Sequence, residues 1–192
     1  MRGIRRVAIL VVSALCLSGC TLVSTSSSPS LVDPATVPLG LLGLTIPFTP
    51  YAQVRWVTRD IYLIAPGQRI VAIPRSMTAP PTLAAVLYYE TQGPTPTEMA
   101  AGLTSQVPSN LVINQADIQG HVASIDVSKV FNQISTANRR IAVGQLVFAA
   151  AAMGATKGIQ ISVEGLPFTL TLASGAKVKV ITPAQMAYLR KG

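Results

Sequence analysis

Alternating apolar and polar residues begin after residue 50 and indicate a domain built from short strands and helices. Residues 53–59 and 61–64 have the β-branched and aromatic content of strands, and Pro66-Gly67 is typical of a turn. Residues 69–73 supply a returning strand. The pattern therefore predicts a β-hairpin at the start of the domain.

Two short helices are predicted after the hairpin. The first begins after Pro80-Pro81 and ends at Gly93-Pro94, because proline suits a first helical turn and glycine suits a helix end. In the second, Thr95 and Glu98 have the spacing of a capping box, and Pro96 suits the first turn. We expect this helix to end near Gly102.

Residues 111–119 and 121–127 predict two antiparallel strands that turn at Gln119-Gly120. On the second strand, Ser124 and Asp126 share one face, and the apolar residues between them share the other. We therefore expect one side of this sheet to face water.

The longest predicted helix covers residues 136–153 and ends at Gly154. Its apolar positions form two adjoining rows, which direct Leu146 and Val147 toward the sheet. The same register predicts that Gln145 lies nearer the solvent, together with Arg139 and Arg140.

The last third of the domain predicts strands at 159–163, 167–171 and 177–181. Strands and helices succeed one another without the repeated crossovers of a wholly parallel sheet. The expected fold is α+β, a two-layer sandwich with a mixed, mostly antiparallel sheet, one long helix and one or two shorter ones. We place the domain at 51–181, followed by a tail or short helix at 182–192.

The N-terminal residues have the layout of a secretory signal, with three arginines before an apolar run at 7–17. That run is about half as long as a membrane-spanning helix, which needs roughly 20 residues. It ends in Leu17, Ser18, Gly19 and Cys20, which resemble the lipobox of bacterial lipoproteins. Residues 1–19 are thus predicted to be a lipoprotein signal peptide.

Cys20 is the predicted lipidation site, since a thiolate is the nucleophile that a diacylglyceryl transfer requires. Cleavage before Cys20 leaves 192 − 19 = 173 residues and, with three arginines removed from a net charge of +8, a charge of +5. Acyl chains would hold the protein on the extracytoplasmic face of the cell membrane. No cysteine pair remains for a disulfide.

Residues 20–50 are predicted to tether the domain to this anchor. Residues 21–30 are rich in serine and threonine and predict a flexible segment. Residues 31–50 are apolar but interrupted by prolines and glycines, so a regular helix or central strand is disfavoured. This segment either lies on a membrane or partner, or packs on the domain as an irregular arm.

Several local phrases of the domain resemble the GerMN domain, named for a protein of spore germination and sporulation and found in many envelope lipoproteins. They follow the order of that family and cover roughly residues 51–181: Val-Ala-Ile-Pro-Arg at 71–75, Gly-Pro-Thr-Pro-Thr-Glu at 93–98, Ala-Ala-Gly-Leu-Thr at 100–104, Val-Ala-Ser-Ile-Asp-Val-Ser at 122–128 and Ala-Val-Gly-Gln-Leu-Val at 142–147.

This resemblance implies an extracytoplasmic α+β module, related in shape to the ring-forming domains of secretion and sporulation assemblies. Members of the family act as scaffolding or accessory parts, and no catalytic activity is attached to them. The resemblance therefore implies a non-enzymatic domain of the cell envelope, present here in a single copy.

Candidate catalytic groups are few. The only histidine, His121, is expected to pack beside a turn. Asp117 and Asp126 lie on adjacent predicted strands and could act as paired carboxylates in glycan cleavage, although Asp126 more simply bonds backbone amides at a strand end. A weak glycan-processing enzyme and an apolar small-molecule carrier remain the alternatives, the latter suggested by the alanine-rich helix end at 149–152.

Lys and Arg number 15 against 7 Asp and Glu, and export argues against nucleic acid as the reason. Arg139 and Arg140, with Lys177 and Lys179, either face lipid headgroups or an envelope protein or polymer, or form an ordinary solvated surface. Self-association is a further alternative. No phosphate-binding loop or metal-ligand set is present, so no cofactor and no metal are expected.

Overall fold

The computed structural model describes residues 54–190. The predicted signal peptide, lipobox, Cys20 and the 20–50 tether therefore lie outside the described residues. Within them, the chain forms an α+β domain with one five-stranded sheet and two two-stranded sheets.

The domain opens with an antiparallel ribbon, β1 (Trp56–Ala65) and β2 (Arg69–Thr78). The two predicted pieces of the first strand are one continuous strand, because Asp60 between them pairs in register with Pro74. The turn contains Gly67 and Gln68 with φ of 85° and 60°. The left-handed conformation at Gly67 is one that glycine adopts without a steric penalty.

Helices α3 (Leu83–Gln92) and α4 (Pro96–Ala100) begin and end close to their predicted positions. Thr82 caps α3 through Ala85 N at 3.1 Å, and Gly93 ends it. The capping box of α4 is present in both directions: Thr95 Oγ1 accepts from Glu98 N, and Thr95 N donates to Glu98 Oε2. Local sequence signals therefore fix these boundaries.

The larger sheet has the order β3-β4-β5-β6, with β9 also paired to β5. β3 (Ile113–Gln119) and β4 (Val122–Val127) are antiparallel, whereas β4 and β5 (Gly158–Val163) are parallel. The connection between the parallel pair contains η3 (Lys129–Gln133) and the long helix α5 (Thr136–Ala152). The mixed, mostly antiparallel sheet is thus confirmed, with one helical crossover in it.

The final strands are shorter than predicted. β6 (Leu166–Pro167) and β9 (Val180–Ile181) pair with β5, while β7 (Leu170–Thr171) and β8 (Lys177–Val178) form a separate hairpin. Helices α6 (Pro183–Met186) and η4 (Ala187–Leu189) follow. Met186 is fully buried and Leu189 nearly so, which extends the packed domain beyond residue 181.

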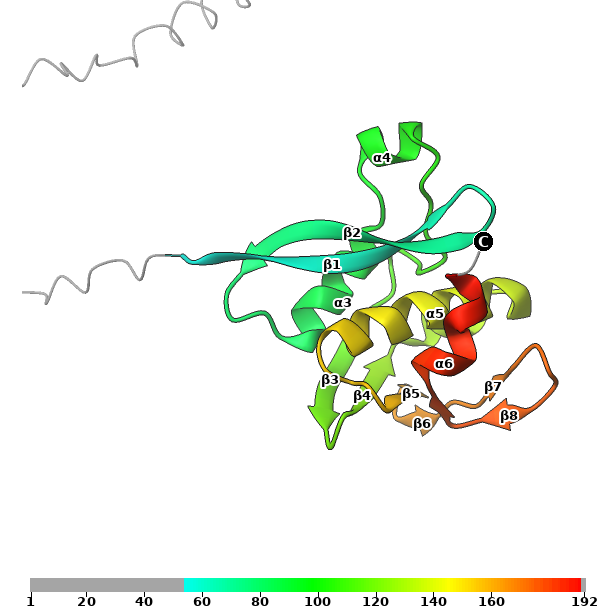
Figure 1. Cartoon of the computed structure of the whole chain (residues 1–192). Helices are drawn as coiled ribbons and strands as arrows, with labels where there is room; N and C mark the ends of the chain where they lie inside the picture. The colour runs from blue at the N-terminus through cyan, green and yellow to red at the C-terminus, as the bar shows by residue number, and fades with distance from the viewer. Residues whose placement is uncertain (1–53, 191–192) are drawn as a thin grey trace, which may run out of the picture. The chain divides into compact units, whose positions relative to one another are not determined.

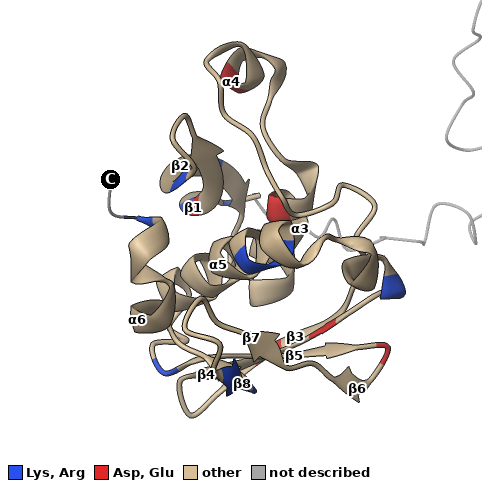
Figure 2. Ribbon diagram, turned by 90° about the vertical axis from the view of Figure 1, so that its right-hand side faces the viewer, with Lys and Arg blue, Asp and Glu red and all other residues tan. Residues whose placement is uncertain are grey.

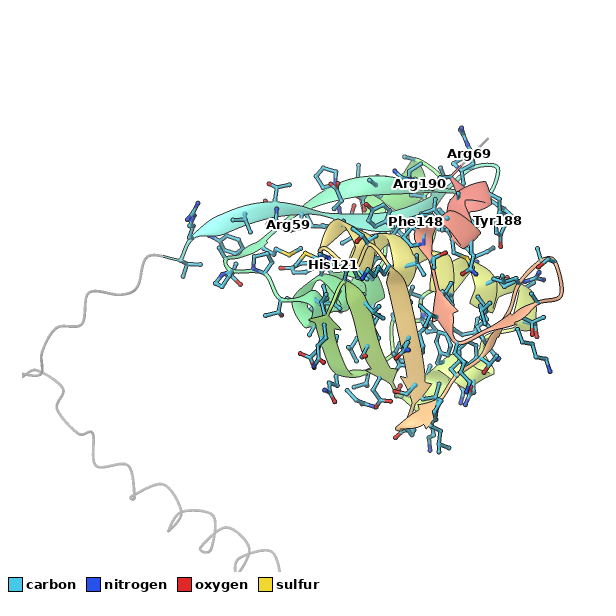
Figure 3. The ribbon with its side chains drawn as sticks, turned by 60° about the horizontal axis from the view of Figure 1, so that its bottom comes forward. Arg59, Arg69, His121, Phe148, Tyr188 and Arg190 are labelled. Atoms are coloured by element: carbon cyan, nitrogen blue, oxygen red, sulfur yellow. The ribbon has the colours of Figure 1, made fainter. Side chains whose placement is uncertain are left out.

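The elements are stacked in layers. Helices α3 and α5 lie between the β1–β2 ribbon and the larger sheet, as Figures 1 and 2 show from two directions. The ribbon is therefore an additional layer beside the predicted helix-on-sheet sandwich. The opposite face of the larger sheet is turned outward in Figure 3.

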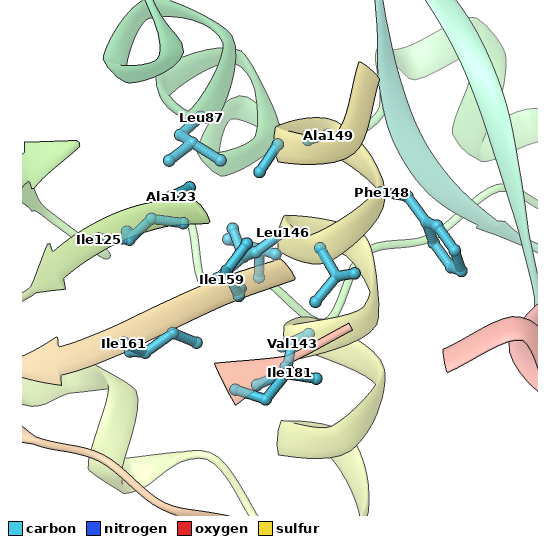
Figure 4. Close-up of a cluster of buried hydrophobic side chains, with 14 of the residues drawn as sticks. Leu87, Ala123, Ile125, Val143, Leu146, Phe148, Ala149, Ile159, Ile161 and Ile181 are labelled. Carbon is cyan, nitrogen blue, oxygen red and sulfur yellow. The ribbon is translucent and has the colours of Figure 1, made fainter. Parts of the chain in front are cut away.

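The core lies where α5 packs on the sheet. Figure 4 shows Val143, Leu146 and Ala149 of α5 directed toward strand residues that include Ile159 and Ile181. All five are buried. The predicted apolar rows of the long helix are confirmed, and their burial stabilises the fold by removing apolar area from water.

Candidate functional site

The outward face of the larger sheet carries a two-row grid of mostly polar side chains. Strand register places Gln115, Asp126, Ser162 and Pro167 side by side in one row, and Asp117, Ser124, Gln160 and Val180 in the next. Residues between them on the same strands, such as Ile125 and Ile161, are buried. The alternation of the strands therefore separates a dry face from a polar one.

Asp126 is the most strongly held residue of the grid. Its Oδ1 accepts from Ser162 Oγ at 2.6 Å and from Gly165 N at 2.8 Å, and its Oδ2 accepts from Asn114 Nδ2 at 2.8 Å. These bonds, that from Ser162 first, hold the pKa of Asp126 below its usual value. The side chain is thus a fixed carboxylate joining β3, β4 and the turn after β5.

A groove of about 360 Å³ lies over this grid. Its lining combines Ser124 and Gln160 with Asp126, Pro167 and Phe168, and Lys179 stands at one side. Within residues 54–190, the Ser124 hydroxyl, the Gln160 amide and the Lys179 ammonium form no side-chain hydrogen bond or ion pair. These groups are free to bond a ligand or partner.

Asp117 and Asp126 lie on this same face, but they do not form an isolated carboxylate pair. Gln115 lies opposite Asp126, and its Nε2 donates to Asp117 Oδ2 at 2.8 Å. A glycosidase acid needs a raised pKa, whereas that of Asp126 is lowered. The geometry favours the predicted role of Asp126 as an acceptor at a strand end, since Gly165 N donates to it.

His121 lies in the β3–β4 turn, one residue later than the predicted position of that turn. Gly120 and His121 both have positive φ, 55° and 69°, as a two-residue hairpin turn requires. His121 is exposed, and its Nδ1 lies 3.3 Å from Gly154 O. It is remote from the groove lining, and Figure 3 shows its place at the end of the sheet.

Arg139 and Arg140 have different environments at the start of α5. Nη2 of Arg139 donates to Asn132 O and Ile134 O, each at 2.7 Å, and its guanidinium lies 5.8 Å from the Phe168 ring centroid. Arg139 therefore stabilises the connection that precedes the helix. Arg140 forms no side-chain hydrogen bond or ion pair within the described residues, although it is half-buried.

Gln145 is fully buried, so the prediction that it lies near solvent was wrong. Its Nε2 donates to Tyr62 O at 2.5 Å and to Ser105 Oγ at 3.2 Å, while Oε1 accepts from Gln106 N at 2.9 Å. Helical periodicity detected the side of α5 that faces the sheet. It could not show that the ribbon covers the other side.

Glu90 of α3 approaches Tyr62 from another direction. Glu90 Oε1 accepts from Tyr62 N at 2.6 Å, and burial raises the pKa of Glu90 well above its ordinary value. One side chain from each of two helices thus bonds the two backbone groups of Tyr62. Two residues further along β1, Ile64 and Thr104 exchange backbone hydrogen bonds of 2.8 and 2.9 Å.

The alanine-rich end of α5 lines a separate, shallow groove of about 540 Å³ with α6. Ala151 and Ala152 contribute to it, but Arg190 covers one side, with its guanidinium 5.2 Å from the Phe148 ring centroid and 5.9 Å from that of Tyr62. Figure 3 shows Arg190 beside Phe148. The cation reduces the apolar character on which the carrier alternative depends.

Two further properties concern the described part of the chain. No helix in residues 54–190 combines the length and apolar character needed to cross a membrane. In the same range, no three His, Cys, Asp or Glu side chains are grouped so that they could hold a metal ion.

Strand alternation in the sequence predicts that Asp126 and Ser124 share one face of the sheet. It does not predict which residues lie beside them on that face, namely Gln115, Gln160, Ser162 and Lys179. The alternation of residues 159–163 contained part of this signal. The missing information was the parallel pairing of β4 with β5, which brings Ser124 beside Gln160.

Residues 60–169 match the family Germane, described as sporulation and spore germination. No match was found among curated proteins.

Three solved structures are similar to the chain. The tandem GerMN domains of the sporulation protein GerM from Bacillus subtilis share 16% identity at a TM-score of 0.50, covering 67% of this chain and 46% of that one. The first GerMN domain of that protein shares 15% identity at a TM-score of 0.50, covering 67% and 98%. A putative lipoprotein from Clostridium perfringens shares 12% identity at a TM-score of 0.40, covering 66% and 87%.

The chain thus spans about half the length of the tandem-domain structure and nearly all of the single domain. At these identities the structural likeness shows the fold. The family match covers more than half of the 192 residues. The protein therefore belongs to the Germane family of sporulation and spore germination, and residues 54–190 form a GerMN-type domain.

Proposed function

We propose that this protein is a lipid-anchored, extracytoplasmic interaction domain that binds an envelope protein or polymer without transforming it. The observation that carries the proposal is the groove over the larger sheet, where Ser124, Gln160 and Lys179 offer hydrogen-bonding groups that no described residue uses. Such a face suits binding to an extended polar partner.

The anchoring part of the proposal depends on the N-terminal sequence. Three arginines, an apolar run and Leu17-Ser18-Gly19-Cys20 occur in the order that lipoprotein processing requires. Two acyl chains on Cys20 would give stable membrane attachment, since one chain gives only marginal binding.

The non-enzymatic part is supported by the state of Asp126. Three donors hold this carboxylate, and its lowered pKa keeps it ionised. Asp117 accepts from Gln115 on the same face. The environment of Asp126 is therefore not that of a proton donor.

Of the two arginines proposed to contact a partner or headgroup, Arg140 is the better candidate. The guanidinium of Arg139 already binds two backbone carbonyls, whereas that of Arg140 has no such bond within residues 54–190. We expect Arg140→Gln to weaken capture of an anionic partner. We expect Arg139→Gln to destabilise the fold instead.

Fatty-acid labelling of cells tests the anchor. Wild-type protein should incorporate the label and remain with membranes, and Cys20→Ser should do neither. Equal labelling of the Cys20→Ser variant would overturn the lipidation site.

Capture from detergent-solubilised envelopes tests the groove. Gln160→Arg places a long cation in the groove and should reduce recovery of the partner at least tenfold. Gln68→Arg is the matched control, because Gln68 is exposed in the β1–β2 turn and does not line the groove. Equal loss with both variants, or with neither, would contradict binding at this face.

A further inference from the structure

The N-terminal end of the β1–β2 ribbon carries an exposed aromatic side chain at the point where the chain enters the domain. Trp56 is the only tryptophan of the protein and is 63% exposed; Val54 beside it is 60% exposed. Figure 1 shows this end of the ribbon extending beyond α3. Because a large aromatic side chain is usually packed in a domain, its exposure at a projecting end indicates a contact surface.

Two cations lie near this tryptophan, Arg55 directly before β1 and Arg59 within it. Arg55 and Arg59 are exposed, and neither forms an ion pair within the described residues. Arg75 lies opposite Arg59 on β2 and forms a bidentate ion pair with Glu98. Its Nη1 donates to Glu98 Oε1 at 2.7 Å and its Nη2 to Glu98 Oε2 at 2.5 Å, so its charge is neutralised. Asp60, next to Arg59, is also exposed, so two arginines against one aspartate leave this end of the ribbon with a net positive charge beside Trp56.

Alternation places Trp56 on one face of the ribbon and the two arginines on the other. A two-stranded ribbon is narrow, since neighbouring strands lie about 5 Å apart. When the end of the ribbon approaches a surface, Trp56 on one face and the arginines on the other can therefore both contact it. Tryptophan together with arginine is typical of protein segments at membrane interfaces. There the indole lies at the depth of the headgroups, and the cations face anionic lipids.

We propose that this end of the ribbon, residues 54–59, docks into the headgroup region of an anionic phospholipid bilayer. The inference rests on the proposed membrane anchoring, which would place Cys20 only 54 − 20 = 34 residues before Val54. The end of the domain nearest to the anchor along the chain is thus the end with interfacial chemistry. Docking there would fix how the sheet groove is presented to the envelope.

Charge and backbone chemistry favour lipid over other occupants. A second copy of the ribbon would bring two arginines and only one aspartate, Asp60, against the same set, so like charges would outnumber opposite ones. Residues 31–50 contain a single acidic residue, Asp33, so they could cover Trp56 without matching both arginines. On β2, Pro74 lacks the N–H that an added strand would need from that edge.

The sole tryptophan makes the proposal directly measurable. The probe is unlipidated protein, residues 20–192 with Cys20→Ser, mixed with vesicles of equal parts phosphatidylcholine and phosphatidylglycerol. We expect the emission of Trp56 to shift to shorter wavelength and to become shielded from acrylamide. The response should be lost in pure phosphatidylcholine and weakened by added salt.

Matched charge variants locate the contact. Removing Arg55 and Arg59 together, as Arg55→Gln/Arg59→Gln, should weaken binding to the anionic vesicles about thirtyfold, from about 1 kcal/mol per charge. The control Arg69→Gln/Lys129→Gln removes the same charge from exposed positions on β2 and η3 and should change binding less than threefold. Vesicle sedimentation of Trp56→Ser, expected to bind at least tenfold more weakly, gives a readout independent of fluorescence.

Three results would overturn the docking proposal. Trp56 could be shielded from acrylamide without vesicles, which would show that the protein's own chain covers it. Emission could stay unchanged with anionic vesicles, or the two double variants could bind equally. Since the protein in these tests carries no lipid, fatty-acid labelling of Cys20 separates a failure of the docking surface from a failure of the anchor.

Discussion

The two sides of the helical layer are held by different forces. Toward the larger sheet, Leu146 and Val143 pack on strand residues such as Ile159, and the contact is apolar. Toward the ribbon, Glu90 and Gln145 bind the backbone of Tyr62. One side is stabilised by removing apolar area from water, and the other includes buried polar groups whose hydrogen bonds must be complete.

The difference follows from what each side has to cover. The sheet presents side chains of its strands to α5, whereas β1 presents the N–H and C=O groups of a strand edge to the helices. A buried backbone group without a partner costs about 1–3 kcal/mol. Side chains of α3 and α5 supply the partners at Tyr62, and Thr104 supplies them at Ile64.

The largest effect is expected on the apolar side. Leu146 is fully buried, so Leu146→Ala should lower the free energy of unfolding by about 2–5 kcal/mol, through lost burial and a residual cavity. Urea denaturation measures this change. Ala152→Ser, at an exposed position of the same helix, should change it by less than about 0.5 kcal/mol. A loss below about 1 kcal/mol for Leu146→Ala would contradict the packing of α5 on the sheet.

The next effect tests the polar side. Gln145→Leu keeps the side-chain bulk but leaves Tyr62 O and Gln106 N without this partner, so we expect a loss of about 1–3 kcal/mol. Gln160→Leu, on the exposed face of β5, is the control and should stay within about 0.5 kcal/mol. Equal stability of the two variants would mean that the contacts of Gln145 add nothing to the fold.

The burial of Gln145 could not be predicted from the sequence. Its neighbours Leu146 and Val147 follow the apolar rows of the helix, and both are buried as predicted. A glutamine outside those rows is ordinarily solvent-facing. Gln145 is buried where it bonds Tyr62, which lies 83 positions earlier in the chain. No local sequence pattern records a contact over that separation.

Helix boundaries were more predictable because their causes are local. Thr95, Glu98, Gly93 and Gly154 act through backbone groups a few residues away. The site was predictable only in part: alternation identified Ser124 and Asp126 as outward-facing, but parallel pairing of β4 with β5 determines their neighbours. Long-range pairing of short strands leaves little local sequence signal.

The third effect is a dependence of stability on pH that comes from Glu90. Burial raises the folded-state pKa of Glu90 above its ordinary value of 4.5. Its contribution to stability is therefore complete below pH 4.5 and is lost as the pH rises through the folded-state pKa, with a slope of up to about 1.4 kcal/mol per pH unit. Glu90→Gln retains an acceptor for Tyr62 N and does not titrate, so it should remove this slope. An unchanged slope in unfolding experiments above pH 4.5 would contradict a buried, protonated Glu90.

The smallest effect concerns Glu98 of α4, a second carboxyl group that contacts the ribbon, and it has the opposite sign. The hydrogen bonds from Arg75 lower the pKa of Glu98 to about 2. Its contribution is present above pH 4.5 and is lost as the pH falls from 4.5 toward 2. The side chains of Arg75 and Glu98 are 17% and 19% exposed, so solvent screening should limit the pair to less than about 1 kcal/mol.

Glu98→Gln should therefore flatten the acid limb of the stability profile and leave the region above pH 4.5 nearly parallel to that of wild type. Asp60→Asn removes an exposed carboxyl group of the same ribbon and controls for the loss of one negative charge. Combining Glu90→Gln with Glu98→Gln should flatten both limbs independently, because the first group acts through burial and the second through an ion pair. If either single variant altered both limbs, the two carboxyl groups would be coupled through Arg75, and the ribbon side would have to be treated as one electrostatic unit.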